Sequence, residues 1–168
     1  MSKHVKFDVS QLEQFADRLT AAGKGDFKKE LALWVDALGV EFLDIITDQI
    51  ISREVTDRRL LLNSFTKGGE DNVWKSSDGG LTLEIGTAVE YAQWVNDGHK
   101  QRPGRFIPGE WKGERFIYTP GASTGMVLKA DWVEGKHYWE AALRTMEAMM
   151  PKYVEAKLNQ WLSRYFGV

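Results

Sequence analysis

The chain has 168 residues, of which 43% are hydrophobic and 12% aromatic, enough to bury a core and close to the size of one domain. Its 22 basic and 24 acidic residues nearly balance, which excludes a global field that would draw it to nucleic acid or an anionic membrane, so any basic site has to be local. Cysteine is absent, which excludes disulfides and thiolate chemistry, and no apolar run approaches the roughly 18 residues that span a bilayer. We therefore expect a protein made in a cytoplasm, with no membrane partner.

The first third of the sequence has the periodicity of helices. Ser10 and Glu13 form a capping-box pattern, and apolar residues then recur at helical spacing as far as Gly23. A second apolar periodicity over residues 26–50 contains no proline and predicts one long helix. The face opposite these apolar residues carries three acidic residues, Glu41, Asp44 and Asp48. Such a face is typical of a solvated surface, with a binding stripe as the alternative.

The middle third changes to the alternation of strands. Asp78-Gly79-Gly80 is a turn signal between residues 73–76 and 81–86, which predicts a β-hairpin. Residues 91–98 return to a spacing of three and four and predict a short helix that ends at a glycine. Apolar alternation over residues 116–128 predicts a second strand pair. The two pairs together predict a small antiparallel sheet of about four strands.

The last third predicts one helix of about 30 residues after Gly135. Pro151 lies inside it and removes a backbone donor, so we expect a kink or break near residues 147–150. Tryptophan positions on apolar helical faces predict core residues: Trp34, Trp139 and Trp161. The expected architecture is a single α+β domain over residues 1–168, with N-terminal helices, the small sheet, and the long C-terminal helix packed on the sheet.

The sequence contains no recognisable catalytic constellation. Residues 104–109 have the glycine spacing of a phosphate loop, but Glu110-Trp111 stands where lysine and serine or threonine are needed. Asp97, His99 and His137 are the only basis for a metal-dependent hydrolase, and two groups on one turn do not complete a coordination sphere. A nucleophile elbow is also missing. We therefore predict that the protein is not an enzyme and uses neither a cofactor nor a metal.

The candidate binding segment is a basic stretch with interleaved aromatic residues. Residues 99–115 carry five cations against Glu110 and Glu114, and their glycine and proline residues predict an extended, irregular loop. Base stacking with phosphate contact would use such residues, so a nucleic-acid site is one interpretation; a protein-binding arm and a plain surface loop are the others. The candidate contact residues are aromatic or basic: Tyr91, Trp94, His99, Lys100, Arg102, Arg105, Phe106, Trp111 and Trp132.

Three segments resemble the signatures of one protein family. They are residues 91–99 (Tyr-Ala-x-Trp-Val-x-x-Gly-His), residues 105–109 (Arg-Phe-Ile-Pro-Gly) and residues 132–137 (Trp-Val-x-Gly-Lys-His). They are similar to motifs of the HK97 gp10-like family of tailed phages and prophages, and the resemblance covers about residues 81–158. Further upstream, residues 56–65 look like the family's segment before its hairpin, although a Thr-Gly pair is missing.

The resemblance implies a structural role in the neck of a phage particle or in tail completion. Such proteins are thought to form a ring at the head-proximal end of the tail, around the path of the DNA, with connector and tail-tube proteins as partners. In that picture Lys100, Arg102 and Arg105 either meet the acidic face of an adjoining copy or point toward DNA in the lumen. We predict a non-enzymatic virion protein for head–tail joining or tail completion, assembled in the bacterial cytoplasm. The alternative is a nucleic-acid-binding accessory protein that uses residues 99–115.

Overall fold

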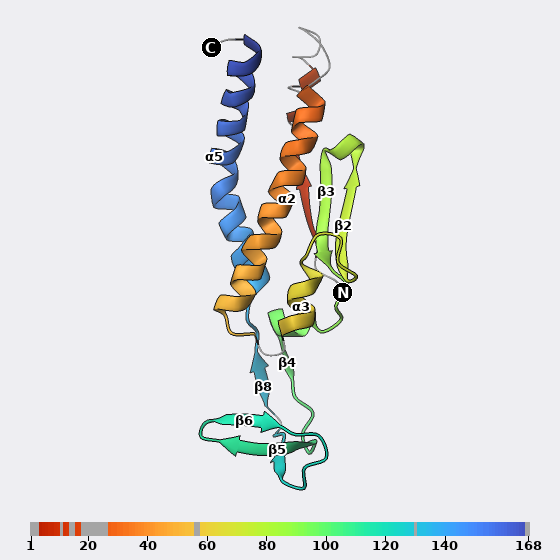
Figure 1. Cartoon of the computed structure of the whole chain (residues 1–168), viewed down its shortest axis with the longest axis vertical. Helices are drawn as coiled ribbons and strands as arrows, with labels where there is room; N and C mark the ends of the chain where they lie inside the picture. The colour runs from red at the N-terminus through yellow and green to blue at the C-terminus, as the bar shows by residue number, and fades with distance from the viewer. Residues whose placement is uncertain are drawn as a thin grey trace.

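The computed structural model describes residues 4–10, 12–13, 16–17, 27–55, 58–129 and 131–166. The molecule is elongated: two long helices lie side by side, a small sheet covers one of them, and a second group of strands is set apart at one end (Figure 1). This arrangement confirms the predicted α+β class. No helix in the described part of the chain is long and apolar enough to cross a membrane.

The two long helices are α2 (Phe27–Ser52) and α5 (Tyr138–Phe166). Helix α2 confirms the helix predicted over residues 26–50. Helix α5 continues through Pro151, so the break that was predicted as one alternative does not occur. Apolar residues on both sides of the proline, Met146 and Tyr153 among them, pack with the core. The two helices pack along each other (Figure 1), so α5 lies mainly on α2 and not on the sheet as predicted. The apolar face of α2 is broad enough to contact both neighbours.

The main sheet contains β1 (His4–Asp8), β2 (Asn72–Ser77) and β3 (Thr82–Thr87) in the antiparallel order β1-β3-β2. The predicted hairpin is confirmed, with the short 3-10 turn Asp78–Gly80 between its strands. Strand β1 was not predicted, because five residues with only two alternating apolar positions give a weak signal. Its Val5 is buried in the core.

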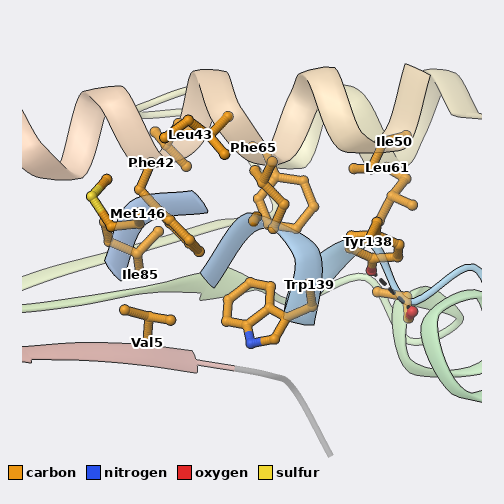
Figure 2. Close-up of a cluster of buried hydrophobic side chains, with 14 of the residues drawn as sticks. Val5, Phe42, Leu43, Ile50, Leu61, Phe65, Ile85, Tyr138, Trp139 and Met146 are labelled. Atoms are coloured by element: carbon orange, nitrogen blue, oxygen red, sulfur yellow. Dashed lines mark hydrogen bonds between the residues drawn. The ribbon is translucent and has the colours of Figure 1, made fainter. Parts of the chain in front are cut away.

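The core lies between α2, the sheet and the first turns of α5 (Figure 2). Phe42 of α2 meets Trp139 edge to face, with ring centroids 5.5 Å apart. Phe65, which follows α3 (Arg58–Ser64), packs beside Trp139 and Tyr138. A second cluster near the other end of the helix pair contains Trp34 and Trp161. All three tryptophans that were predicted to be core residues are buried: Trp34, Trp139 and Trp161.

The helix predicted after Ser10 can be followed only in part. The described residues of this segment have helical backbone: Ser10, Leu12, Glu13, Ala16 and Asp17. Its predicted end at Gly23 lies outside the described residues. Ser10 is not the N-cap, because the Val9 carbonyl already accepts the Glu13 N–H. Just before the helix, Asp8 Oδ1 accepts the hydrogen bond of the Ser10 backbone N–H at 2.9 Å. That hydrogen bond also lowers the pKa of the Asp8 carboxyl.

The remaining strands do not join the main sheet. Strands β4 (Gly98–Lys100) and β8 (Trp132–Glu134) pair with each other and form what we call the stalk. Beyond it, β5 (Phe106–Lys112) lies between β6 (Arg115–Tyr118) and β7 (Gly125–Val127), and these three strands form the tip (Figure 1). The described residues therefore form three small sheets instead of one sheet of about four strands.

Strand β5 corrects the prediction that residues 99–115 are irregular. Pro108 and Gly109 lie inside this strand. Pro108 has no N–H to donate, but its carbonyl accepts the Thr119 N–H, while the Gly109 N–H donates to the Thr124 carbonyl. Gly109 has a φ of 154° and is covered by the ring of Phe116, a close approach that leaves no room for a side chain. Proline and glycine here shape a strand and do not end it.

Candidate functional site

Two of the three motif segments, residues 91–99 and 132–137, meet at the base of the stalk although they lie far apart in the sequence. Asn96 in α4 (Ala92–Asp97) is fully buried, and its side-chain oxygen accepts the Trp139 backbone N–H at 2.9 Å. Its amide nitrogen donates to the carboxylate of Glu140 at 2.9 Å and to that of Asp97 at 2.7 Å. The Asn96 carbonyl in turn accepts the His137 N–H. Asn96 therefore holds the start of α5 against the end of α4, and we call this contact the clasp.

Two motif glycines make the clasp close enough to form. A Cβ atom on Gly98 would lie 2.5 Å from the Val133 carbonyl oxygen, and one on Gly135 would overlap the Asn96 carbonyl oxygen. Gly98 also has a φ of 84°, which a side chain disfavours. These glycines are therefore needed for backbone contact between the two segments.

Tyr138 completes the buried part of the clasp. Its hydroxyl donates to the Ala92 carbonyl at 3.0 Å, and this bond is drawn in Figure 2. Burial raises the pKa of Tyr138 well above its usual range, and the nearby charges of Asp97 and Glu140 raise it further. The hydroxyl therefore stays protonated and remains a donor. Tyr91, one of the predicted contact residues, packs against the same core.

Five predicted contact residues come together in a pocket between the stalk and the tip. The pocket has a volume of about 520 Å³ and is lined by Trp94, His99, Lys100, Arg102 and Arg105, together with Gln101 and Leu128. The ring centroids of Trp94 and His99 are 6.3 Å apart, and Trp94 is 58% exposed. Three cations and no carboxylate line this space. We call it the basic pocket.

The cations of the basic pocket are not neutralised from within the described part of the chain. No ion pair of Lys100, Arg102 or Arg105 occurs there, whereas Lys112 of β5 pairs with Glu110 at 3.4 Å. The three positive charges can bind an anionic group, and the exposed tryptophan beside them can contact an aromatic or apolar part of the same ligand. Trp132 lies in a neighbouring hollow of about 410 Å³ with Lys100 and Asp131.

The tip has almost no buried residue of its own. Between residues 106 and 127 only Gly109 is buried. The predicted contact residues Phe106 and Trp111 are 49% and 59% exposed, and Trp111 meets Phe116 with ring centroids 5.3 Å apart. Two further exposed apolar residues were missed by the sequence reasoning: Tyr118 and Val127. Their exposure depends on β5 lying between β6 and β7, which the sequence pattern did not reveal.

The acidic residues predicted on α2 do lie on its exposed side. Glu41, Asp44 and Asp48 are exposed and form no ion pair with other described residues. Three apolar residues of the same helix are also exposed: Leu33, Val40 and Ile51. At 100° per residue these three and Asp44 fall within about 20° of one line along the helix. We call this mixed apolar and acidic surface the outer face of α2.

The structure places no metal site on the residues considered for one. Among the described residues, no group of three or more histidine, aspartate or glutamate side chains is arranged to hold a metal ion. Asp97 is engaged in the clasp through Asn96, while His99 lines the basic pocket. His137 lies where the chain turns into α5, with a φ of 49°. The three do not assemble into one site.

Comparison with known proteins gives both a family and close relatives. A family described as "Bacteriophage HK97-gp10, putative tail-component" matches residues 13–98. The chain is 42% identical over 158 residues to the phage-like element PBSX protein XkdI of Bacillus subtilis strain 168, which covers 93% of this chain and 98% of the relative. It is also 42% identical over 165 residues to the uncharacterized protein YqbI of the same strain, covering 94% of this chain and 99% of the relative. No solved structure matches the chain.

The family match covers just over half of the chain and ends where the stalk begins. It contains α2, the hairpin and the first half of the clasp motif, up to Gly98. The tip and the motif at residues 132–137 lie outside the matched residues. XkdI extends the similarity over nearly the whole chain. This chain belongs to the HK97 gp10-like family of phage tail components.

Proposed function

We propose that the protein is a non-enzymatic subunit of a ring-shaped neck layer that joins head to tail or completes the tail of a phage or prophage particle. Its family is that of a phage tail component, and its relative XkdI belongs to a phage-like element. The finer role rests on one structural observation. The basic pocket and the exposed aromatic residues of the tip lie at one end of the molecule, whereas the acidic outer face lies on α2, so the two candidate contact surfaces differ from each other.

Two different surfaces on one subunit favour a head-to-tail contact between copies. When the rotation of such a heterologous contact closes, it produces a ring. Connector and tail-tube proteins would then contact the two sides of the ring, and the particle would be assembled in the host cytoplasm. The proposed role needs no catalytic group, and the basic pocket contains cations and one histidine but no nucleophile with an activating base.

The basic pocket also favours a second candidate function, nucleic-acid binding. Trp94 could stack on a base while Lys100, Arg102 and Arg105 contact phosphates, in an accessory protein or in the lumen of the ring. Three phosphate contacts to a single strand would give a slope of roughly −2 in a plot of log affinity against log salt. The net charge of −2 gives no further attraction to DNA. We therefore place this function second.

Electron microscopy of lysates tests the proposed role. A phage or prophage from which this gene is deleted should still make DNA-filled heads and also tails, and the defect should appear as unjoined heads and tails or as tails of irregular length. Complementation with the wild-type gene is the control. Normal infectious particles from the deletion strain would contradict the proposal, as would a strain that makes no heads.

A further inference from the structure

We infer that the tip and basic pocket of one copy bind the outer face of α2 on a second copy. This inference rests on the proposed ring and names the two surfaces that would form its subunit contact. It combines features that lie far apart within one molecule, as Figure 1 shows for α2 and the strands of the tip.

The tip has an exposed apolar surface that a partner could cover. A small sheet becomes stable when one of its apolar faces packs against another element. Here Phe106, Trp111 and Tyr118 are 49%, 59% and 62% exposed, and no side chain of the tip sheet is buried. The register of β5 and β6 places Trp111 and Tyr118 on the same face of the tip. Exposed aromatic residues that share a face mark an interaction surface, and the cations of the neighbouring basic pocket favour an acidic partner.

The outer face of α2 has the complementary composition. Its exposed apolar residues are Leu33, Val40 and Ile51, and its exposed carboxylates are Glu41, Asp44 and Asp48. Within the described residues these carboxylates have no ion-pair partner, and neither do the three cations of the basic pocket. Three unpaired negative charges therefore match three unpaired positive charges, with apolar groups on both sides to bury. Nucleic acid would match the cations but would leave the apolar line on α2 unexplained.

The contact has to form between copies. The stalk carries the tip beyond the end of the helix pair, so the tip does not lie along α2 of its own copy (Figure 1). The tip and the outer face are different surfaces, so each copy offers one of each and the contact repeats from subunit to subunit. That repetition is the geometry that the proposed ring requires.

Charge reversal on each surface tests the contact. One variant carries Lys100→Glu, Arg102→Glu and Arg105→Glu; the other carries Glu41→Lys, Asp44→Lys and Asp48→Lys. In each variant alone, the basic-pocket surface and the outer face of α2 carry charges of the same sign and repel each other. Its self-association, measured by sedimentation velocity, should therefore weaken at least tenfold. In an equimolar mixture the acidic tip of the first meets the basic α2 of the second, and the basic tip of the second meets the acidic α2 of the first. The mixture should therefore assemble.

A matched control separates the contact from the change in net charge. Arg59, Arg144 and Lys152 are exposed cations outside both surfaces, and changing all three to glutamate alters the net charge as much as the first variant does. This control should assemble as the wild type does. If either reversal unfolds by circular dichroism, the glutamine variants at the same positions replace it, again with an expected weakening of at least tenfold for each.

The outcomes distinguish this contact from the ring itself. Wild-type assembly that neither reversal weakens would overturn the contact and leave the ring in place. Loss of assembly in the tip variant alone, with no rescue in the mixture, would overturn α2 as the partner. A wild type that stays monomeric at all concentrations would overturn both proposals. A monomer that binds a single-stranded oligonucleotide, and loses that binding with the tip variant, would assign the basic pocket to nucleic acid.

Discussion

Asn96→Ala is the substitution that should damage the clasp most directly. It removes every hydrogen bond of a fully buried side chain: those to the Glu140 and Asp97 carboxylates and the one from the Trp139 N–H. A hydrogen bond to a charged group contributes about 1.5–3 kcal/mol, and a buried N–H left without an acceptor costs about 1–3 kcal/mol. The free energy of unfolding should therefore fall by about 3–5 kcal/mol.

Chemical denaturation followed by tryptophan fluorescence measures this loss, and thermal melting should show Tm lowered by roughly 10 °C for a chain of this length. Asn159→Ala is the matched control, because Asn159 is exposed on α5 and its truncation should change stability by less than about 0.5 kcal/mol. Asn96→Asp keeps an acceptor for the Trp139 N–H but cannot donate to Glu140, and it adds a like charge beside it. It should therefore destabilise the protein as well.

A loss of less than about 1 kcal/mol in Asn96→Ala would refute the clasp as a stabilising contact. The motif segments would then lie together for a reason other than these hydrogen bonds. A loss of the expected size, with unchanged stability in Asn159→Ala, would show that the motif at residues 91–99 and the motif at residues 132–137 act as one structural unit.

Three further predictions concern the clasp and the tip. Gly135→Ala should lower the free energy of unfolding by roughly 2 kcal/mol in chemical denaturation, because its Cβ would meet the backbone of Asn96 and Gly98. For Tyr138, the folded pKa lies above the unfolded value of 10.0, so its contribution is complete below pH 10 and is lost as the pH rises further. Urea unfolding between pH 8 and pH 11 should therefore show declining stability at the alkaline end, with a smaller decline in Tyr138→Phe. Replacing residues 102–130 by a two-residue turn removes the tip and joins the paired strands β4 and β8 directly. The free energy of unfolding of the remaining chain should change by less than about 1 kcal/mol, whereas assembly in sedimentation velocity should be abolished. Unchanged assembly would exclude the tip as a contact surface.

Local patterns in the sequence predicted the long elements well. The apolar spacing of α2 and the turn signal at residues 78–80 are both short-range features, and each led to the correct helix or hairpin. Gly39 lies within α2, although glycine is unfavourable in the interior of a helix. The structure gives its reason, because Trp74 and Leu83 pack directly against it and a Cβ would collide with both. That contact joins residues more than 30 positions apart, so propensity could not reveal it.

The strands beyond residue 97 were harder to predict because their partners are distant. Strand β4 pairs with β8 across about 30 residues, and β5 separates two strands that had been expected to pair with each other. Strand β5 was predicted to be a loop because it contains Pro108 and Gly109. The candidate contact residues were nevertheless chosen by chemistry, and five of them line one pocket. Charge and aromatic content identified that region even where the backbone prediction was wrong.

The clasp and the tip use different residues, so the motifs indicate the fold and not the partner. The motif residues Asn96, Gly98 and Gly135 are buried or in close contact with backbone. The motifs around them therefore indicate a structural contact, which fixes the position of the stalk relative to α4 and α5. The surfaces available to a partner are built largely from other residues, such as Tyr118 on the tip and Val40 on α2. A protein can therefore keep the motifs, and with them the fold, while the chemistry of its tip changes. Partner choice should accordingly follow the tip and the outer face of α2, and substitutions there should alter assembly without altering the stability of the fold.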